Sequence, residues 1–203
     1  MEGYNREELY KKQVNLYMES NPNPNSLKFV ANYMLVGQGQ TFDYPDVQSA
    51  RESPLAVELF NLPYVRRVFI MSNFVTVTKD PQSEWIEVQD EIKQLITQYL
   101  KSEKPIVITP EDQGEGPQEE QTKSGNHELE DRIKDILDEY IKPAVEMDGG
   151  AIQFHSFEDG VVKVLLQGAC SGCPSSTITL KAGIENLLKR MVPEVQQVEA
   201  EGI

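Results

Sequence analysis

Residues 148–174 read DGGAIQFHSFEDGVVKVLLQGACSGCP. Two apolar runs in this stretch, 151–157 and 161–167, lie on either side of Asp159-Gly160. Asp-Gly between two such runs is a strong signal for a β-hairpin. The stretch therefore predicts two antiparallel strands joined by a tight turn.

The second run leads into a loop that holds the chain's two cysteines, Cys170 and Cys173, and Pro174 then stands at a natural first helical position. Gly172 frees the loop backbone, so both sulfurs can turn outward. The N-terminus of the following helix favours thiolate, which is both a metal ligand and a nucleophile. The motif indicates a soft-metal or redox site rather than two buried packing residues, and by itself it does not choose between metal and redox.

Two amphipathic helices are predicted around this stretch. The apolar residues of the first are Leu129, Ile133, Ile136, Leu137 and Tyr140. Those of the second are Leu180, Ile184, Leu187, Leu188 and Met191. Gly149 and Gly150 should end the first helix in the left-handed conformation, and Pro193 breaks the second. Residues 195–199 predict a last strand, so the expected order is α-β-β-α-β.

The first half of the chain reads as mixed helix and strand. Strands are predicted where Val14, Leu16 and Met18 alternate, and over residues 27–36, 65–70 and 74–78. Helices are predicted over residues 54–60, after the Ser53-Pro54 start signal, and over residues 84–100. An Asn- and Pro-rich turn at residues 21–25 separates the first two strands.

The segment 101–127 marks the clearest boundary in the chain. Its middle, residues 109–126, has no large apolar residue and is dominated by Gly, Pro, Glu and Gln. Such a segment buries too little surface to offset the entropy of ordering it. The sequence therefore predicts an α+β protein with two small α+β domains, residues 12–102 and 128–203, joined by a flexible acidic linker over residues 103–127.

The charge balance excludes several classes of partner. Lys and Arg total 19 against 33 Asp and Glu, which gives a net charge of −14. Nucleic-acid binders and proteins that dock on anionic lipid need cationic surface, so neither class is expected. No apolar run approaches the roughly 18 residues of a membrane span. Residues 1–10 are polar and acidic and show no targeting pattern, so a cytoplasmic location is expected.

The number of cysteines limits what one chain can bind. Zinc or an iron–sulfur cluster usually takes four protein ligands, and this chain offers two sulfurs. His127 lies in the predicted linker, and His155, on a predicted strand, is expected to be a surface or core residue rather than a ligand. Two chains that each supply Cys170 and Cys173 across a two-fold axis would provide four thiolates. A cluster held in this way lies at an interface near solvent, which suits a carrier.

Several motifs together resemble a known family. DGGAI at 148–152 and LQGACSGCPSST at 166–177 resemble the NifU C-terminal-type domain of the Nfu iron–sulfur carrier family. PNPNSLKF at 22–29, SPLA at 53–56 and VTVT at 75–78 are similar to the Nfu N-terminal domain. The resemblance covers most of the chain apart from the predicted linker and the first dozen residues.

The resemblance implies a non-enzymatic carrier. It implies an iron–sulfur cluster, usually 4Fe–4S, that is shared between the two chains of a homodimer, with Cys170 and Cys173 as its ligands. An upstream scaffold would be the donor of the cluster, and apo iron–sulfur proteins would be its acceptors. The chain has no other cysteine, so it resembles the short two-domain carriers, for which receipt and delivery are favoured over assembly. In the family the N-terminal half is linked to recognition of partners.

Two alternatives use the same cysteines. A thiol–disulfide oxidoreductase also places a CxxC motif at a strand–helix junction, although Ser171-Gly172 between the cysteines and the lack of a preceding βαβ unit are unlike thioredoxin. A structural zinc clip could hold a dimer in which the N-terminal domain is the working part. Insulin reduction and visible absorption, respectively, distinguish these alternatives from a cluster carrier.

Overall fold

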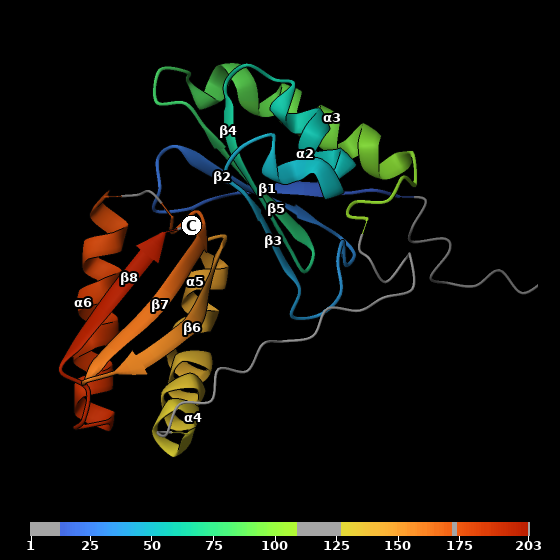
Figure 1. The fold of residues 1–203 in the computed structure, drawn as a ribbon. Helices are drawn as coiled ribbons and strands as arrows, with labels where there is room; N and C mark the ends of the chain where they lie inside the picture. The colour runs from blue at the N-terminus through green and yellow to red at the C-terminus, as the bar shows by residue number, and fades with distance from the viewer. Residues whose placement is uncertain (1–12, 109–126, 172–173, 203) are drawn as a thin grey trace, which may run out of the picture.

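The structure, a computed structural model, describes residues 13–108, 127–171 and 174–202. These residues form two α+β domains, as the sequence predicts (Figure 1). Most of the predicted flexible linker, residues 109–126, lies outside the described residues. Among the described residues, no helix combines the length and apolar character needed to cross a bilayer.

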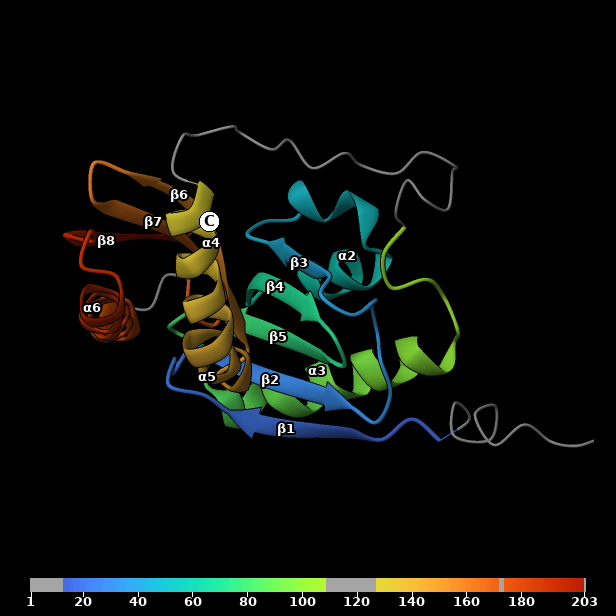
Figure 2. The same ribbon diagram turned by 90° about the horizontal axis from the view of Figure 1, so that it is seen from below.

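The N-terminal domain is a five-stranded antiparallel sheet with the strand order β1-β2-β5-β4-β3. Its strands are β1 (Leu16–Ser20), β2 (Ser26–Ala31), β3 (Thr41–Tyr44), β4 (Val65–Met71) and β5 (Phe74–Lys79). One face of the sheet is covered by α2 (Pro54–Phe60) and α3 (Trp85–Lys101), and a short 3₁₀ helix, η1 (Ser49–Glu52), precedes α2 (Figures 1 and 2).

Local signals account for most of these elements. Ser53 caps α2, because its Oγ accepts the Ala56 N–H at 3.2 Å. The predicted strand over residues 27–36 ends at Ala31, because Leu35 N–H and Val36 N–H donate to Ser72 O instead of extending the ladder. Strand β3 and helix η1 were not predicted. At four residues each, both are too short for a periodic pattern.

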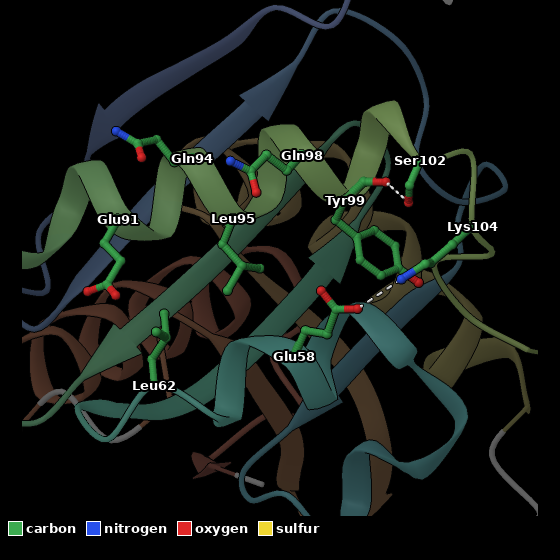
Figure 3. Close-up of a pocket in the computed structure, with 9 residues that line it drawn as sticks. All are labelled: Glu58, Leu62, Glu91, Gln94, Leu95, Gln98, Tyr99, Ser102 and Lys104. Carbon is green, nitrogen blue, oxygen red and sulfur yellow. Dashed lines mark hydrogen bonds and ion pairs between the residues drawn. The ribbon is translucent and has the colours of Figure 1, made fainter.

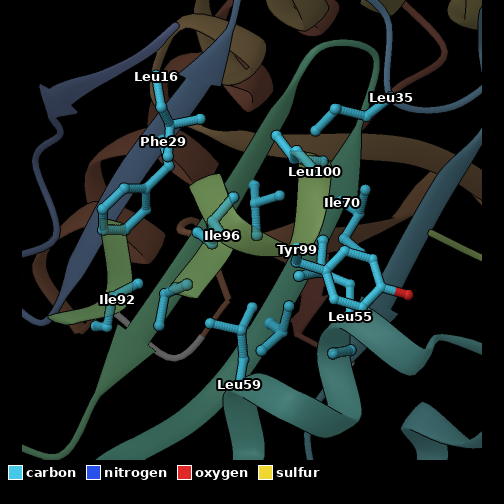
Figure 4. Packing of buried hydrophobic residues seen from close by; sticks show 14 of the residues in the cluster. Leu16, Phe29, Leu35, Leu55, Leu59, Ile70, Ile92, Ile96, Tyr99 and Leu100 are labelled. Carbon is cyan, nitrogen blue, oxygen red and sulfur yellow. The ribbon is translucent and has the colours of Figure 1, made fainter. Parts of the chain in front are cut away.

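The central strands of the N-terminal sheet are buried on both faces, which the alternation of its strands did not indicate. Phe29 on β2 packs toward the helices with Leu59, Ile92 and other core residues (Figure 4). Leu27, two residues earlier on β2, belongs to the same buried cluster. Lys28 and Thr76 point to the opposite face, yet they are only 8% and 1% exposed. The reason is that the C-terminal domain packs against this second face.

The C-terminal domain has the predicted order α-β-β-α-β. Its elements are α4 (His127–Ile136), η3 (Leu137–Ile141), α5 (Lys142–Met147), β6 (Gly150–Glu158), β7 (Val161–Gly168), α6 (Pro174–Met191) and β8 (Gln197–Gly202). The sheet order is β6-β7-β8, with β7 antiparallel to β6 and parallel to β8. The crossover helix α6 and the helices before β6 pack on this sheet (Figure 2).

Backbone chemistry explains the details of this domain. Asp159 and Gly160 have φ of 50° and 81°, as the tight hairpin turn requires. Segment η3 is π-helical and was not predicted. It lies just before Pro143, which has no N–H and whose ring crowds the carbonyl four residues earlier. Gly149, with φ of 78°, ends α5, whereas Gly150 was expected to belong to the helix stop and instead begins β6.

The last strand starts two residues later than predicted. The predicted range began at residue 195, but β8 begins at Gln197. Val195 N–H still donates to Val192 O at 3.0 Å, and Gln196 N–H donates to Gly160 O at 2.7 Å. These turn hydrogen bonds delay the start of the ladder with β7.

Candidate functional site

Cys170 lies in the loop that leaves β7 and leads to α6, where the sequence placed it. Main-chain hydrogen bonds within the C-terminal domain help to shape the described part of this loop: Ala169 N–H donates to Gly149 O at 3.2 Å, and Ser171 N–H donates to Gly168 O at 3.1 Å. Gly168 has φ of 63°, a conformation that favours glycine. Cys170 is 5% exposed, so its sulfur lies in the loop's interior and not on its surface.

Gly150 provides the space for the Cys170 side chain. A Cβ at position 150 would lie 2.9 Å from Cys170 Sγ and 2.6 Å from Gln167 O. Both distances are shorter than real side-chain contacts allow. The sequence analysis identified Gly150 as a helix-stop signal and as part of the DGGAI motif, whereas the structure assigns it to packing beneath the cysteine.

Cys173, the second predicted ligand, lies outside the described residues, as does Gly172. Helix α6 begins directly afterwards at Pro174 and runs to Met191. The positive end of its dipole therefore faces the cysteine loop, an environment that lowers cysteine pKa values in proteins.

A cavity of about 350 Å³ lies beside Cys170. Asp148, Cys170 and Leu180 of the C-terminal domain line it, and so do Pro22 and Asn23 of the N-terminal domain. Burial raises the pKa of the Asp148 carboxyl above its ordinary value, and the charge of Lys28 opposes this rise. The cysteine therefore lines a hollow whose wall comes from both domains.

The N-terminal domain also holds the backbone of the cysteine loop. Asn23 Nδ2 donates to Ala169 O at 3.0 Å. Gly168 N–H donates to Asp43 Oδ2 at 3.0 Å. The Asp43 carboxylate is 3% exposed and also accepts two hydrogen bonds from the Arg67 guanidinium, at 2.7 and 2.8 Å. Nothing in the sequence pattern singled out Asn23 or Asp43 as parts of the site, because their partners are main-chain atoms more than a hundred residues away.

His155 is not among the described residues that line the cavity beside Cys170. His155 is exposed, at an irregularity in the pairing of β6 with β7. His127 is the first residue of α4. Within residues 13–108, 127–171 and 174–202, no group of three or more His, Cys, Asp or Glu side chains is placed to hold a metal ion.

A second hollow lies far from the cysteine, between α2 and α3 on the outer side of the N-terminal sheet (Figure 3). Its volume is about 410 Å³, and most of its lining is polar. Glu58 and Lys104 pair across one end at 3.3 Å, and Ser102 Oγ donates to Tyr99 O at 2.6 Å. Glu58 and Lys104 thus pair with each other in an open groove whose lining, among the described residues, includes no residue of the cysteine loop.

Comparison with known proteins agrees with the two-domain architecture. The NifU-like domain family matches residues 133–199, and the family described as scaffold protein Nfu/NifU N terminal matches residues 16–103. The chain belongs to the Nfu family. The resemblance drawn from its motifs is thereby confirmed.

Two curated relatives are each named "NFU1 iron-sulfur cluster scaffold homolog, mitochondrial". The chain is 39% identical over 195 residues to the one from Drosophila willistoni, covering 93% of this chain and 64% of the relative. It is 39% identical over 189 residues to the one from Drosophila persimilis, covering 93% of this chain and 66% of that relative. A solution structure of a NifU-like protein from Saccharomyces cerevisiae aligns with 25% identity and a TM-score of 0.42, over 53% of this chain and 92% of that one.

The expected cytoplasmic location is wrong. The Drosophila relatives of this Nfu chain are named as mitochondrial proteins, which points to the mitochondrion rather than the cytoplasm. The expectation rested on the polar, acidic residues 1–10. Because the chain spans only 64–66% of these two relatives, its first residues are not a guide to compartment.

Proposed function

We propose that this Nfu protein carries an iron–sulfur cluster as cargo, bound between two subunits by Cys170 and Cys173 of each, and delivers it to apo iron–sulfur proteins. The observation that supports this most strongly is the position of Cys170, in the loop between β7 and the N-terminus of α6. This loop lies within the segment that matches the NifU-like domain family. The names of the relatives, which describe iron–sulfur cluster scaffolds, support the same cargo.

Two chains are needed because one chain contributes two sulfurs and a cluster takes four thiolates. A two-fold axis beside the loop completes the ligand set without further residues. We take the cargo to be a 4Fe–4S cluster received from an upstream scaffold. Mössbauer spectroscopy of the loaded dimer separates it from a 2Fe–2S cluster.

Delivery follows from ligand exchange. An acceptor's thiolates replace those of Cys170 and Cys173 one at a time, so the cluster changes hosts with no net oxidation or reduction and no enzymatic turnover. The positive end of the α6 dipole favours negative charge at the loop that would hold the cluster. For the domain division we propose residues 12–102, a linker over 103–127, and the cluster-binding domain over 128–203.

Anaerobic reconstitution tests this function. Iron, sulfide and solution mass should show one cluster per dimer, and both Cys170→Ser and Cys173→Ser should abolish it. His155→Ala is the matched control and should keep a full cluster, because this side chain is exposed on β6. An iron-free monomer, or a Cys173→Ser protein with a full cluster, would refute the proposal.

The same preparation separates the alternative functions. A cluster absorbs visible light through iron–sulfur charge transfer, whereas zinc thiolate does not. Efficient insulin reduction would favour the oxidoreductase, and a colourless dimer containing zinc would favour the structural clip.

A further inference from the structure

The second face of the N-terminal sheet is built to bind the cysteine loop. Strand alternation directs Lys28, Asp43, Phe69 and Thr76 to this face, opposite α2 and α3. Together with Asn23 in the turn after β1, we call these residues the docking face. A sheet face exposed to water would carry freely solvated side chains. Here Phe69 and Thr76 are 0% and 1% exposed.

The docking face recognises main-chain atoms on both sides of the cysteine loop. Besides the bonds to Gly168 N–H and Ala169 O described above, Thr76 Oγ1 donates to Gly149 O at 2.7 Å. Lys28 Nζ donates to the last carbonyls of α5, at 3.2 and 3.3 Å. A lysine of one domain thus caps a helix of the other, with the favourable charge for a helix C-terminus.

Two glycines of the C-terminal domain make this close approach possible. A Cβ at position 149 would lie 2.7 Å from Thr76 Oγ1, and one at position 168 would lie 2.7 Å from the Phe69 ring. Phe69 also belongs to a small buried cluster that reaches Ala151 of β6. The segments before and after the cysteine are therefore shaped to fit the docking face.

Docking of the N-terminal sheet on the cysteine loop opposes the rearrangement that a cluster shared between two subunits requires. The Cys170 sulfur packs over Gly150 and must turn outward to meet iron held by a second subunit. That movement changes the backbone at Gly168 and Ala169, which Asp43 and Asn23 hold in place. A second subunit must also approach the end of the C-terminal domain that the N-terminal sheet now covers (Figure 1).

We propose that the docking face is an internal cap on the cluster site, and that docking and the cluster-bridged dimer are mutually exclusive. This inference rests on the proposed function, whose regulation it describes. If the cluster binds only the open form, its apparent affinity equals the intrinsic affinity multiplied by the fraction of molecules that are open. Weakening the docking face should therefore expose Cys170 in proportion to the open fraction. It should raise the apparent association constant of the loaded dimer by up to the square of that factor, because both subunits must be open.

Two near-isosteric substitutions weaken docking while keeping each domain's own contacts. Thr76→Val removes the hydroxyl donor and suits a β-strand, and Gly149 O keeps the Ala169 N–H. Asn23→Asp removes the donor to Ala169 O but keeps the oxygen that accepts Asn25 N–H at 3.0 Å. Losing one such hydrogen bond should raise the open fraction roughly 2- to 10-fold.

Thr78→Val is the matched control, because Thr78 lies two residues along β5 on the same face and is only partly buried. For it, the structure shows no hydrogen bond to the described part of the C-terminal domain. The full-length Cys173→Ser protein, free of iron, has one cysteine, so iodoacetamide labelling follows Cys170 alone.

Thr76→Val and Asn23→Asp should each speed labelling of Cys170 roughly 2- to 10-fold, and Thr78→Val should leave it unchanged. For Thr76→Val the same factor is expected at two pH values, because this substitution adds no charge near the thiol and opening is not a change in thiol pKa. With both cysteines restored, the two variants should also form more loaded dimer at limiting protein.

Equal labelling rates for all proteins, or equal acceleration by Thr78→Val, would overturn the cap even if the unsubstituted protein binds a cluster. Faster labelling without more loaded dimer would also overturn it, since the competition would be absent. If no protein binds a cluster, the proposed function fails, and the competition fails with it. The labelling rates would still report docking itself.

Discussion

Gly150→Ala tests the reasoning about the space beneath Cys170. The new Cβ would lie 2.6 Å from Gln167 O and 2.9 Å from Cys170 Sγ. The carbonyl is main chain in β7 and cannot move cheaply, so the first pair of the hairpin, Gly150 with Gly168, must separate or the sulfur must leave its place. Overpacking of this kind costs about 1–3 kcal/mol. For a domain of this size, each kcal/mol lowers the unfolding temperature by about 4–8 °C.

Gly183→Ala is the control, because it is the same chemical change with the opposite expected sign. Gly183 is exposed in the middle of α6, and a Cβ there meets nothing within 4 Å apart from the helix's own backbone. Alanine in a helix interior should stabilise the domain by about 0.5–1 kcal/mol.

Calorimetry measures both changes in the full chain. Trp85, the only tryptophan, lies on α3, so its fluorescence identifies the transition of the N-terminal domain. The transition of the C-terminal domain should fall for Gly150→Ala and rise for Gly183→Ala. An unchanged or higher transition in Gly150→Ala would refute the packing argument.

Three further substitutions test the two domains. Hydrogen bonds from Lys189 and from Val198 N–H lower the pKa of Glu185 below its ordinary value of 4.5. This stabilisation is present at neutral pH and is lost as the pH falls through the native pKa. The Glu185→Gln protein should therefore have a lower unfolding temperature than the unsubstituted protein at pH 7, and the difference should vanish in acid. Ser53→Ala removes the α2 cap and should cost about 0.5–2 kcal/mol in a urea titration; no change would contradict the capping role. Leu59→Ala, at a core position that is 0% exposed, should cost about 2–5 kcal/mol by the same titration, and a loss below 1 kcal/mol would show that the core there is loosely packed.

Local sequence signals were sufficient for most elements of the fold. Asp159-Gly160 determined the hairpin because few other residue pairs adopt two positive φ angles cheaply. Ser53-Pro54 located the start of α2, and the helical stripe located α3. Strand β3 has no comparable signal, since a short edge strand forms only when β4 is there to pair with it.

The candidate site also combines features that local sequence indicated with features that it did not. Cys170 and Cys173 were identified from their spacing and from the helix start at Pro174, which are local features. The contacts made by Asn23, Asp43 and other docking-face residues could not be identified, because a hydrogen bond to a distant main-chain atom leaves no pattern in the sequence. Alternation along β2 and β5 indicated two faces but could not say what covers the second.

The sequence by itself thus determined most of the order of elements, the two-domain division and the candidate sulfur ligands, because turns, caps and apolar periodicity act over a few residues. Only the tertiary structure decided that the two domains meet, that Gly150 accommodates the Cys170 side chain, and that the N-terminal sheet closes over the loop. These features depend on contacts between residues far apart in the chain, and such contacts exist only once both domains have folded.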